Sequence, residues 1–262
     1  MDIYSKYMPP DYLALKISYC REQLEKLPIV RTQVHTISGS TIIMVAVGNH
    51  KYHADSPNGI NALNILKTRF ALENELNIYE AIWKSKYKEE PDTSCKPHSA
   101  NRRLYIDTNK SVILDKSYFD SLINNADSNY PKPTDYPFKG IYYRSAAERD
   151  IAMFYTDAGI PFKYEPAIKI CGLPKPINTD FVIYIKELDN CKFHEHFGMK
   201  NSSNYLRITK LKYCNYTDAG LVPEIDILFT HDTEDMPFCI SNLTHKLNTA
   251  IAITANGTLP TR

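Results

Sequence analysis

Two carboxylates stand at neighbouring apolar segments in the second half of the chain. Asp180 precedes the run Phe181-Val182-Ile183-Tyr184-Ile185, and Glu195 lies in His194-Glu195-His196-Phe197-Gly198-Met199. Short apolar runs bounded by polar turns are typical of buried strands. On adjacent strands, both carboxylates could converge on one ion, and Mg²⁺ prefers oxygen ligands. The spacing therefore predicts a divalent-cation site suited to phosphodiester hydrolysis, with the backbone carbonyl of His196 as a third ligand.

A lysine follows at helical spacing. Tyr205, Ile208, Lys212 and Tyr216 recur at intervals that place them on one helical face, and Lys210 lies on another. Lys212 thus interrupts an apolar stripe that would face the sheet. There it would orient the attacking water or stabilise phosphate charge.

The surrounding elements come in a definite order. Ser145-Ala146-Ala147-Glu148 begins a helix that ends at Gly159-Ile160-Pro161. Strands are predicted at residues 162–170, 180–185 and 193–197, followed by the helix that carries Lys212 and by one more strand. Glu148 could hold an auxiliary metal-bound water or a second ion, and Glu165 is a weaker candidate for the same ligand shell.

In this order the chain resembles the PD-(D/E)XK nuclease superfamily over roughly residues 140–245. More narrowly, it resembles a bacterial and phage group that shares an Arg-Ser-x-x-Glu helix start, a Tyr-Glu strand, an Asp-Phe strand and a Glu-His-Phe-Gly-Met strand. Here these motifs begin at Arg144, Tyr164, Asp180 and Glu195. The chain departs from the superfamily motif at two positions, because Thr179 replaces its proline and Phe197 replaces its lysine.

In the resembled group a lysine on the next helix stands four residues before a tyrosine and eight before a glycine. Lys212, Tyr216 and Gly220 match that spacing. The resemblance implies an α/β fold whose C-terminal part is a restriction-endonuclease-like αβββαβ core, a mixed sheet flanked by helices. It also implies a nuclease in which Mg²⁺ or Mn²⁺ activates a water molecule to attack a phosphodiester bond. DNA is expected as the substrate rather than RNA, because the resembled superfamily acts mostly on DNA.

The expected catalytic residues are Glu148, Asp180, Glu195 and Lys212, and the expected substrate contacts are Arg144, Ser145, His194 and Arg207.

Other readings of the same residues stay open. An acid before an apolar strand is often a solvated turn residue, an acid in a first helical turn often complements the macrodipole, and a lysine at a sheet edge often snorkels. Since the in-strand lysine is missing, the chain could be a catalytically silent nuclease-fold module that binds nucleic acid or protein as a regulator of a phage or mobile element. His194 and His196, with Cys191 nearby, offer zinc as a third reading.

Composition sets the remaining limits. The 262-residue chain has a net charge of +1, so any surface for nucleic acid must be local. The basic candidates for such a surface are Arg102, Arg103, Lys200, Arg207 and Lys210. The six cysteines lack the spacing of a disulfide framework, and no signal or membrane-spanning segment is evident, which predicts a cytoplasmic protein without membrane contact.

The first half predicts a helix-and-hairpin α+β module. A helix from Asp11 to Leu27 precedes strands at residues 30–36 and 41–47, and a long helix covers residues 60–88. Prolines 131, 133 and 137 predict a linker. The expected organisation is an accessory region at 1–125, a linker at 126–139 and a nuclease domain at 140–262. The heptad-like first helix suggests a homodimer through the N-terminal region.

Overall fold

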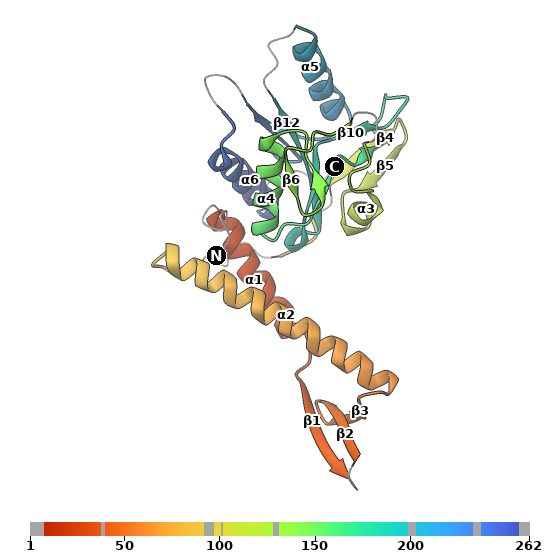
Figure 1. Ribbon diagram of the computed structural model, residues 1–262, viewed down its shortest axis with the longest axis vertical. Helices are drawn as coiled ribbons and strands as arrows, with labels where there is room; N and C mark the ends of the chain where they lie inside the picture. The colour runs from red at the N-terminus through yellow and green to blue at the C-terminus, as the bar shows by residue number, and fades with distance from the viewer. Residues whose placement is uncertain are drawn as a thin grey trace. The chain divides into compact units, whose positions relative to one another are not determined.

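The computed structural model describes residues 8–37, 40–91, 97–100, 102–127, 131–198, 203–232 and 237–256. Met199 and Lys200, which were expected in the strand motif and in a basic surface, lie outside these ranges. The chain divides into two compact units, one of residues 13–94 and one of residues 1–12 and 95–262 (Figure 1). Each unit is described by itself.

The smaller unit contains the predicted helix and hairpin. Helix α1 (Pro10–Lys26) enters it from the other unit, and strands β1 (Val30–Ile37), β2 (Ser40–Val47) and β3 (His50–His53) form an antiparallel sheet in the order β1-β2-β3. Helix α2 (Pro57–Lys86) begins at Ser56, whose hydroxyl accepts a hydrogen bond from the Gly59 N–H. One face of the sheet packs against α2 through Val30, Val45 and Ala62.

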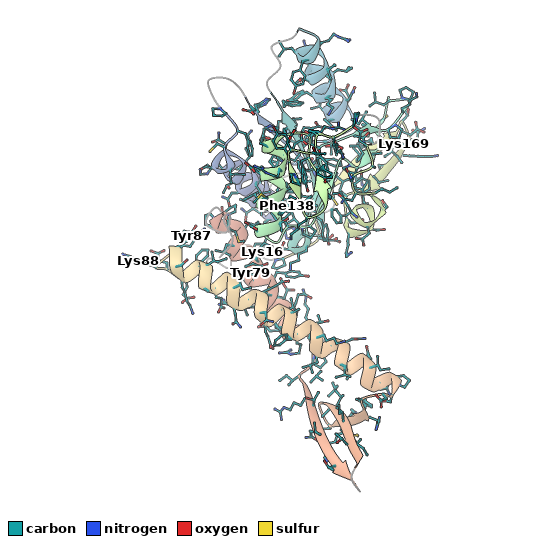
Figure 2. All side chains as sticks on the ribbon, in the orientation of Figure 1. Lys16, Tyr79, Tyr87, Lys88, Phe138 and Lys169 are labelled. Carbon is teal, nitrogen blue, oxygen red and sulfur yellow. The ribbon has the colours of Figure 1, made fainter. Side chains whose placement is uncertain are left out.

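Helices α1 and α2 contact each other through charged and polar side chains within this unit. The ammonium of Lys16 lies 5.2 Å from the centre of the Tyr79 ring, and both side chains are labelled in Figure 2. Arg21 of α1 also forms an ion pair with Glu80 of α2 at 2.7 Å. These contacts hold the two helices together.

The larger unit is built on a four-stranded sheet in the order β13-β12-β11-β8. Strands β8 (Phe162–Tyr164) and β11 (Phe181–Ile185) pair antiparallel, as do β11 and β12 (Asn190–Phe197), whereas β12 and β13 (Ile227–His231) pair parallel. The sheet is therefore mixed, and the chain is a mixed α/β protein. The remaining strands form two-stranded pairs: β4 (Arg103–Asp107) with β5 (Lys110–Ile113), β6 (Pro137–Phe138) with β7 (Ile141–Tyr142), and β9 (Ala167–Ile168) with β10 (Ile177–Asn178).

The helices cover both faces of this sheet. Alternate residues of β12 point to opposite faces, and His194 contacts Tyr155 of α4 (Ala146–Asp157) while Lys192 contacts Thr254 of α6 (Ile240–Ala255). On the other face, Glu195 contacts α5 (Ser203–Asp218), and an apolar core joins β11, β12 and β13 to β4, β5 and α3 (Lys116–Ser121). The helix predicted from Ser145, the helix with Lys212, the strands predicted at 180–185 and 193–197 and one further strand, β13, are present. The single strand predicted at 162–170 is wrong: Glu165 has a positive φ of 44° and Pro166 follows it, so the segment is divided into β8 in the main sheet and β9, which pairs with β10. Helices α3 and α6 were not predicted.

The proline-containing segment at 126–139 is not an extended linker in the residues described. The Asn125 and Ala126 N–H groups donate to carbonyls of Tyr164 and Glu165 at 2.6 and 3.2 Å, and Lys132 forms an ion pair with Glu165. The sequence-based boundary therefore falls inside the larger unit. The described residues of this segment are exposed or half-buried, but the segment is tied to the end of β8 by these hydrogen bonds and this ion pair.

A fragment of residues 138–262 is expected not to fold cooperatively. It would lose Leu104, Leu114, Phe119 and Leu122 from the core. Deleting one large core side chain costs about 2–5 kcal/mol, so four together cost about as much as the usual total stability of roughly 5–15 kcal/mol. Thermal unfolding by circular dichroism checks this against the full chain. A sharp transition in the fragment would contradict it and restore the boundary at 126–139.

Within the described residues, no helix is long and apolar enough to cross a membrane. The described cysteines, Cys20, Cys171, Cys191, Cys214 and Cys239, are free, as their spacing predicted.

Candidate active site

Strand register brings the two predicted carboxylates together. Phe181 of β11 pairs with His194 of β12, so the next antiparallel pair along the ladder is Asp180 opposite Glu195. Directly opposed residues have their side chains on the same face, with Cβ atoms about 5 Å apart. The Asp180 carboxylate also accepts a hydrogen bond from the His196 N–H at 2.7 Å. Asp180 is thereby fixed to the strand that carries Glu195.

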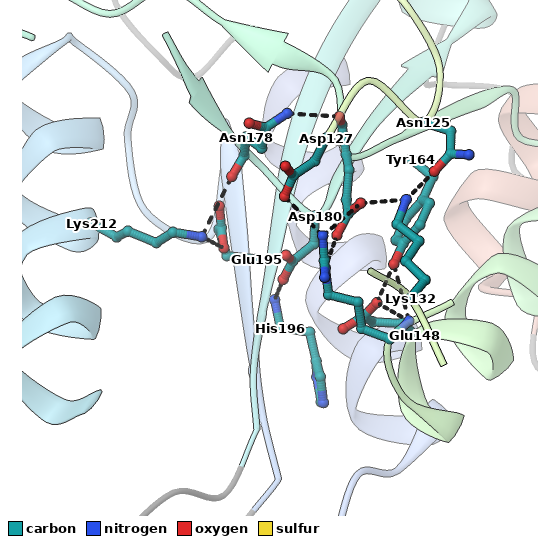
Figure 3. Close-up of polar contacts among 12 residues, drawn as sticks. Asn125, Asp127, Lys132, Glu148, Tyr164, Asn178, Asp180, Glu195, His196 and Lys212 are labelled. Atoms are coloured by element: carbon teal, nitrogen blue, oxygen red, sulfur yellow. Dashed lines mark hydrogen bonds and ion pairs between the residues drawn. The ribbon is translucent and has the colours of Figure 1, made fainter. Parts of the chain in front are cut away.

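Helix α5 supplies two partners for Glu195. The ammonium of Lys212 lies 2.8 Å from Glu195 Oε2, and the Tyr216 hydroxyl donates to Glu195 Oε1. Figure 3 shows Lys212 reaching from its helix toward Glu195 and Asn178, whose carbonyl lies 3.5 Å from the ammonium. Lys212 and Tyr216 are four residues apart and so share one helical face. The sequence predicted that Lys212 faces the sheet and that Lys210 does not. The structure agrees, because Lys212 contacts Glu195 of β12 and Lys210 is exposed.

The electrostatics of this group favour an added cation. Burial and the negative charge of Glu195 raise the pKa of Asp180 well above its ordinary value, with Lys212 acting in the opposite direction. Burial disfavours the ammonium of Lys212, but the charges of Glu195 and Asp180 outweigh this and raise its pKa. Burial and Glu195 also raise the pKa of Tyr216. One lysine thus faces two carboxylates, and it stays protonated.

These groups face one cavity of about 230 Å³. Asp180, Glu195 and Lys212 line it together with residues from β10, β12 and α5 and from the segment before β6, among them Asp127, Asn178, Tyr205 and Ile208. Glu195 is 1% exposed, so its carboxylate is almost completely buried at the wall of this cavity. The cavity is polar on one side and bounded by α5 on the other.

A second cluster adjoins the first at the end of β8. The guanidinium of Arg144 forms ion pairs with Glu165 and with Asp127, the latter at 2.9 Å, and Lys132 also pairs with Glu165. Arg144 and Glu165 both line the cavity. Arg144, expected to contact substrate, and Glu165, expected as a weak metal ligand, are therefore bound to each other.

Glu148 lies beside this cluster and is not among the residues that line the cavity. Its carboxylate accepts hydrogen bonds from the Tyr164 hydroxyl at 2.6 Å and from the Arg144 N–H at 3.2 Å. Burial raises the pKa of Glu148, and those two hydrogen bonds act against the rise. Its charge also contributes to the raised pKa of Asp180.

His194 is a core histidine in this structure, in contrast to the substrate contact expected of it. It is fully buried, with Nδ1 2.8 Å from the Tyr155 hydroxyl and Nε2 2.8 Å from the Thr230 hydroxyl. Burial lowers the pKa of His194 well below its ordinary value. Because side chains alternate along a strand, a neighbour of Glu195 must point to the opposite face.

The zinc reading of β12 does not fit the geometry. His194 and His196 do share a face and both contact the Thr230 hydroxyl, but Cys191 lies on the other face, where its thiol contacts the Asp115 carbonyl. The histidines are placed to support the fold and, through the His196 N–H, to hold Asp180.

The other expected substrate contacts are placed as follows. Ser145 is the N-cap of α4, with its hydroxyl accepting from the Glu148 N–H at 3.2 Å. Arg207 is exposed on α5 and is not part of the cavity lining. Of the other basic candidates, Arg102 is bound to the buried carboxylate of Asp226, with Nε 2.8 Å from Oδ1.

Sequence reasoning assigned no role in the site to three of its residues. Tyr216 had a signal, because it shares a helical face with Lys212 and a buried tyrosine hydroxyl usually has a hydrogen-bond partner. Asp127 and Lys132 lie in the segment interpreted as a linker, where polar residues and prolines are expected and give no indication of a site. Their contacts with Arg144 and Glu165 form only after distant segments fold together.

The donor set fits Mg²⁺ or Mn²⁺. Within the described ranges, no three His, Cys, Asp or Glu side chains are arranged as a ready metal site. Mg²⁺, however, is usually bound by one or two carboxylates, with waters and substrate phosphate as its remaining ligands. Asp180 and Glu195 supply those carboxylates, and each carboxylate oxygen can accept more than one partner. Burial and the charge of Glu195 raise the pKa of Asp180, and a bound cation would act in the opposite direction.

Comparisons of the chain with protein-family models, with curated proteins and with solved structures find no match.

Proposed function

We propose that this chain is a divalent-cation-dependent nuclease with a PD-(D/E)XK-like core, acting on the phosphodiester bonds of DNA. The observation that carries the proposal is the convergence of Asp180, Glu195 and Lys212 on one cavity. Two carboxylates on adjacent strands and a lysine from the facing helix are the groups that this chemistry needs. The order of α4, β8, β11, β12, α5 and β13 supports the same core.

Asp180 and Glu195 would hold Mg²⁺ or Mn²⁺ at the cavity. When bound, the cation would neutralise charge on the phosphate and lower the pKa of a water. The His196 N–H and the Tyr216 hydroxyl hold the two carboxylates in place before the substrate arrives. Such fixed dipoles and charges need no reorganisation during the reaction.

Lys212 acts as a fixed positive charge and not as a base. Its pKa is raised by Glu195 and Asp180, so the ammonium keeps its protons near neutral pH. It is therefore suited to stabilising negative charge that develops on the phosphate. Lys212 would thus replace the lysine of the superfamily motif. Phe197 stands at that position in this chain, and its ring stacks on Phe229 in the core, with 5.6 Å between the ring centres.

The second candidate is a nuclease-fold module without catalysis. One observation favours it: Glu195 already has two partners, Lys212 and Tyr216, so the site is partly neutralised by its own residues. Such a module would bind nucleic acid or a protein partner without cutting.

The deciding experiment measures cleavage of plasmid, linear duplex and single-stranded DNA, and of RNA, with Mg²⁺, with Mn²⁺ and with EDTA. Cleavage with either cation and none with EDTA is the expected result. Retention of a substrate without cleavage under any of these conditions would favour the silent module.

A further inference from the structure

The three-stranded sheet of the smaller unit has an open face. Its other face packs on α2 through Val30 and Val45, and alternate residues therefore point away from the helix. The open face consists of two complete rows across the sheet, Arg31-Ala46-Lys51 and Gln33-Met44-His53.

Each row has polar ends and an apolar centre. Arg31, Gln33, Lys51 and His53 stand on the two edge strands and are exposed, whereas Met44 and Ala46 on the central strand are half-buried. Adjacent strands are about 4.8 Å apart, so the polar ends of a row lie about 10 Å apart. Two lines of donors thus flank a shallow apolar strip.

The charge of this face is positive and not neutralised nearby. From Lys26 to Ala54 the chain has no Asp or Glu, although it has 30 acidic residues in all. Within the described part of the chain, neither Arg31 nor Lys51 forms an ion pair. His53 lies 3.5 Å from the carboxylate of Asp55. The net charge of +1 for the whole chain therefore does not reveal the local excess of positive charge on this face.

We infer that the open face of the β1–β3 sheet binds the phosphate backbone of duplex DNA. Arg31 and Lys51 would contact phosphates, with Gln33 and His53 as further hydrogen-bond donors, and the apolar strip between them tolerates sugar and base edges. A ribbon of this width is compatible with the major groove, which is about 12 Å wide. The inference deepens the proposed function by assigning its substrate contact to the smaller unit.

Two other occupants fit the face less well. A second copy of the same face would bring like charges together, which opposes association. An anionic membrane would match the charge, but binding there also relies on bulky apolar side chains that enter the lipid. The apolar strip offers Ala46, Met44 and Ile42, all of them half-buried on the central strand. Duplex DNA needs the charge and not the bulk.

The test is fluorescence anisotropy of a labelled 30-base-pair duplex with the full chain in EDTA, at several salt concentrations. The charge-reversed pair Arg31→Glu/Lys51→Glu is expected to weaken the affinity at least roughly tenfold. The matched control, Lys67→Glu/Lys84→Glu, changes the net charge equally at exposed positions of α2 and should stay within about threefold of the original chain.

For a second double variant, Arg31→Ala/Lys51→Ala, the affinity for the duplex is measured as a function of salt concentration. Losing two phosphate contacts should reduce the slope of log K against log salt by about two. It also replaces the charge-reversed pair if circular dichroism shows that the latter is unfolded. Equal losses in the control, an unchanged slope, or binding to anionic vesicles but not to the duplex would each overturn the inference.

The binding test is separate from catalysis, because EDTA removes the cation. A chain that binds through this face but never cleaves would retain the inference and refute the proposed nuclease. If the Arg31→Ala/Lys51→Ala variant cleaved DNA and bound it with unchanged affinity, the proposed nuclease would be supported and the inference about this face would be refuted.

Discussion

Replacing Asp180 with Asn is expected to abolish cation-dependent cleavage and to raise the unfolding temperature of the metal-free chain. Burial and Glu195 raise the pKa of Asp180 in the folded state, so the folded state holds this proton more tightly than the unfolded state does. Stability from this group is therefore present at low pH and is lost as pH rises through the folded pKa. A neutral amide removes the cost at neutral pH, and it also removes a metal ligand.

The two readouts together separate catalysis from folding. The cleavage rate with Mg²⁺ should fall by about three orders of magnitude or more. Thermal unfolding in EDTA should shift upward, by about 2–4 °C for each kcal/mol gained in a chain of this size. Loss of activity with a lowered unfolding temperature would show that Asp180 supports the fold instead of the reaction.

Glu195→Gln is the matched control for the stability readout. It should lose cleavage to a similar extent, because it removes the second carboxylate. It should not gain stability, because Glu195 has Lys212 and Tyr216 as partners, and an amide would leave the ammonium without its closest opposite charge. A gain in stability for both variants would mean that both carboxylates lack compensation to the same degree.

Periodicity predicted the parts of the site that depend on one element. It placed Asp180 and Glu195 at strands and put Lys212, not Lys210, on the face of α5 that meets the sheet. It also located the start of α4 at Ser145. These follow from local rules, namely the two-residue period of a strand, the 3.6-residue period of a helix and the chemistry of an N-cap.

The same rules, applied strictly, correct one expectation. Residues next to Glu195 must face the other side of the sheet, and His194 is accordingly packed against Tyr155 and Thr230. Only a residue at an even interval could share the cavity through its side chain. Phe197 does so, and it lines the cavity.

The rest of the site depends on contacts that no local pattern contains. Arg144 meets Glu165 and Asp127 across 17 or more residues, and Asp127 comes from a segment whose prolines and polar residues indicated a linker. Polar composition is typical of exposed segments, but buried carboxylates that pair with basic residues have the same residue types in the sequence. The difference lies in the pairing, which is set by the packing of the whole unit.

Replacing Lys212 with Ala should reduce the cleavage rate by about two to three orders of magnitude, the range for losing one preorganised contact with the transition state. Its ammonium is the nearest positive charge to Glu195 and contacts it at 2.8 Å. Lys210→Ala, on an exposed face of the same helix, should change the rate by less than about twofold, since surface substitutions rarely matter. Single-turnover cleavage at saturating Mg²⁺ measures both.

Cation affinity distinguishes a catalytic loss in this variant from a structural one. Lys212 and the cation compete for the negative charge of Glu195 and Asp180, so Lys212→Ala should bind Mg²⁺ more tightly while it cleaves more slowly. Calorimetric titration of Mg²⁺ into the variant and into the original chain gives the comparison. A variant that bound Mg²⁺ more weakly as well would indicate that α5 had lost its position over the sheet. Equal rates for Lys212→Ala and Lys210→Ala would remove Lys212 from the reaction, because charge at the cavity would then be no more useful than charge on the surface.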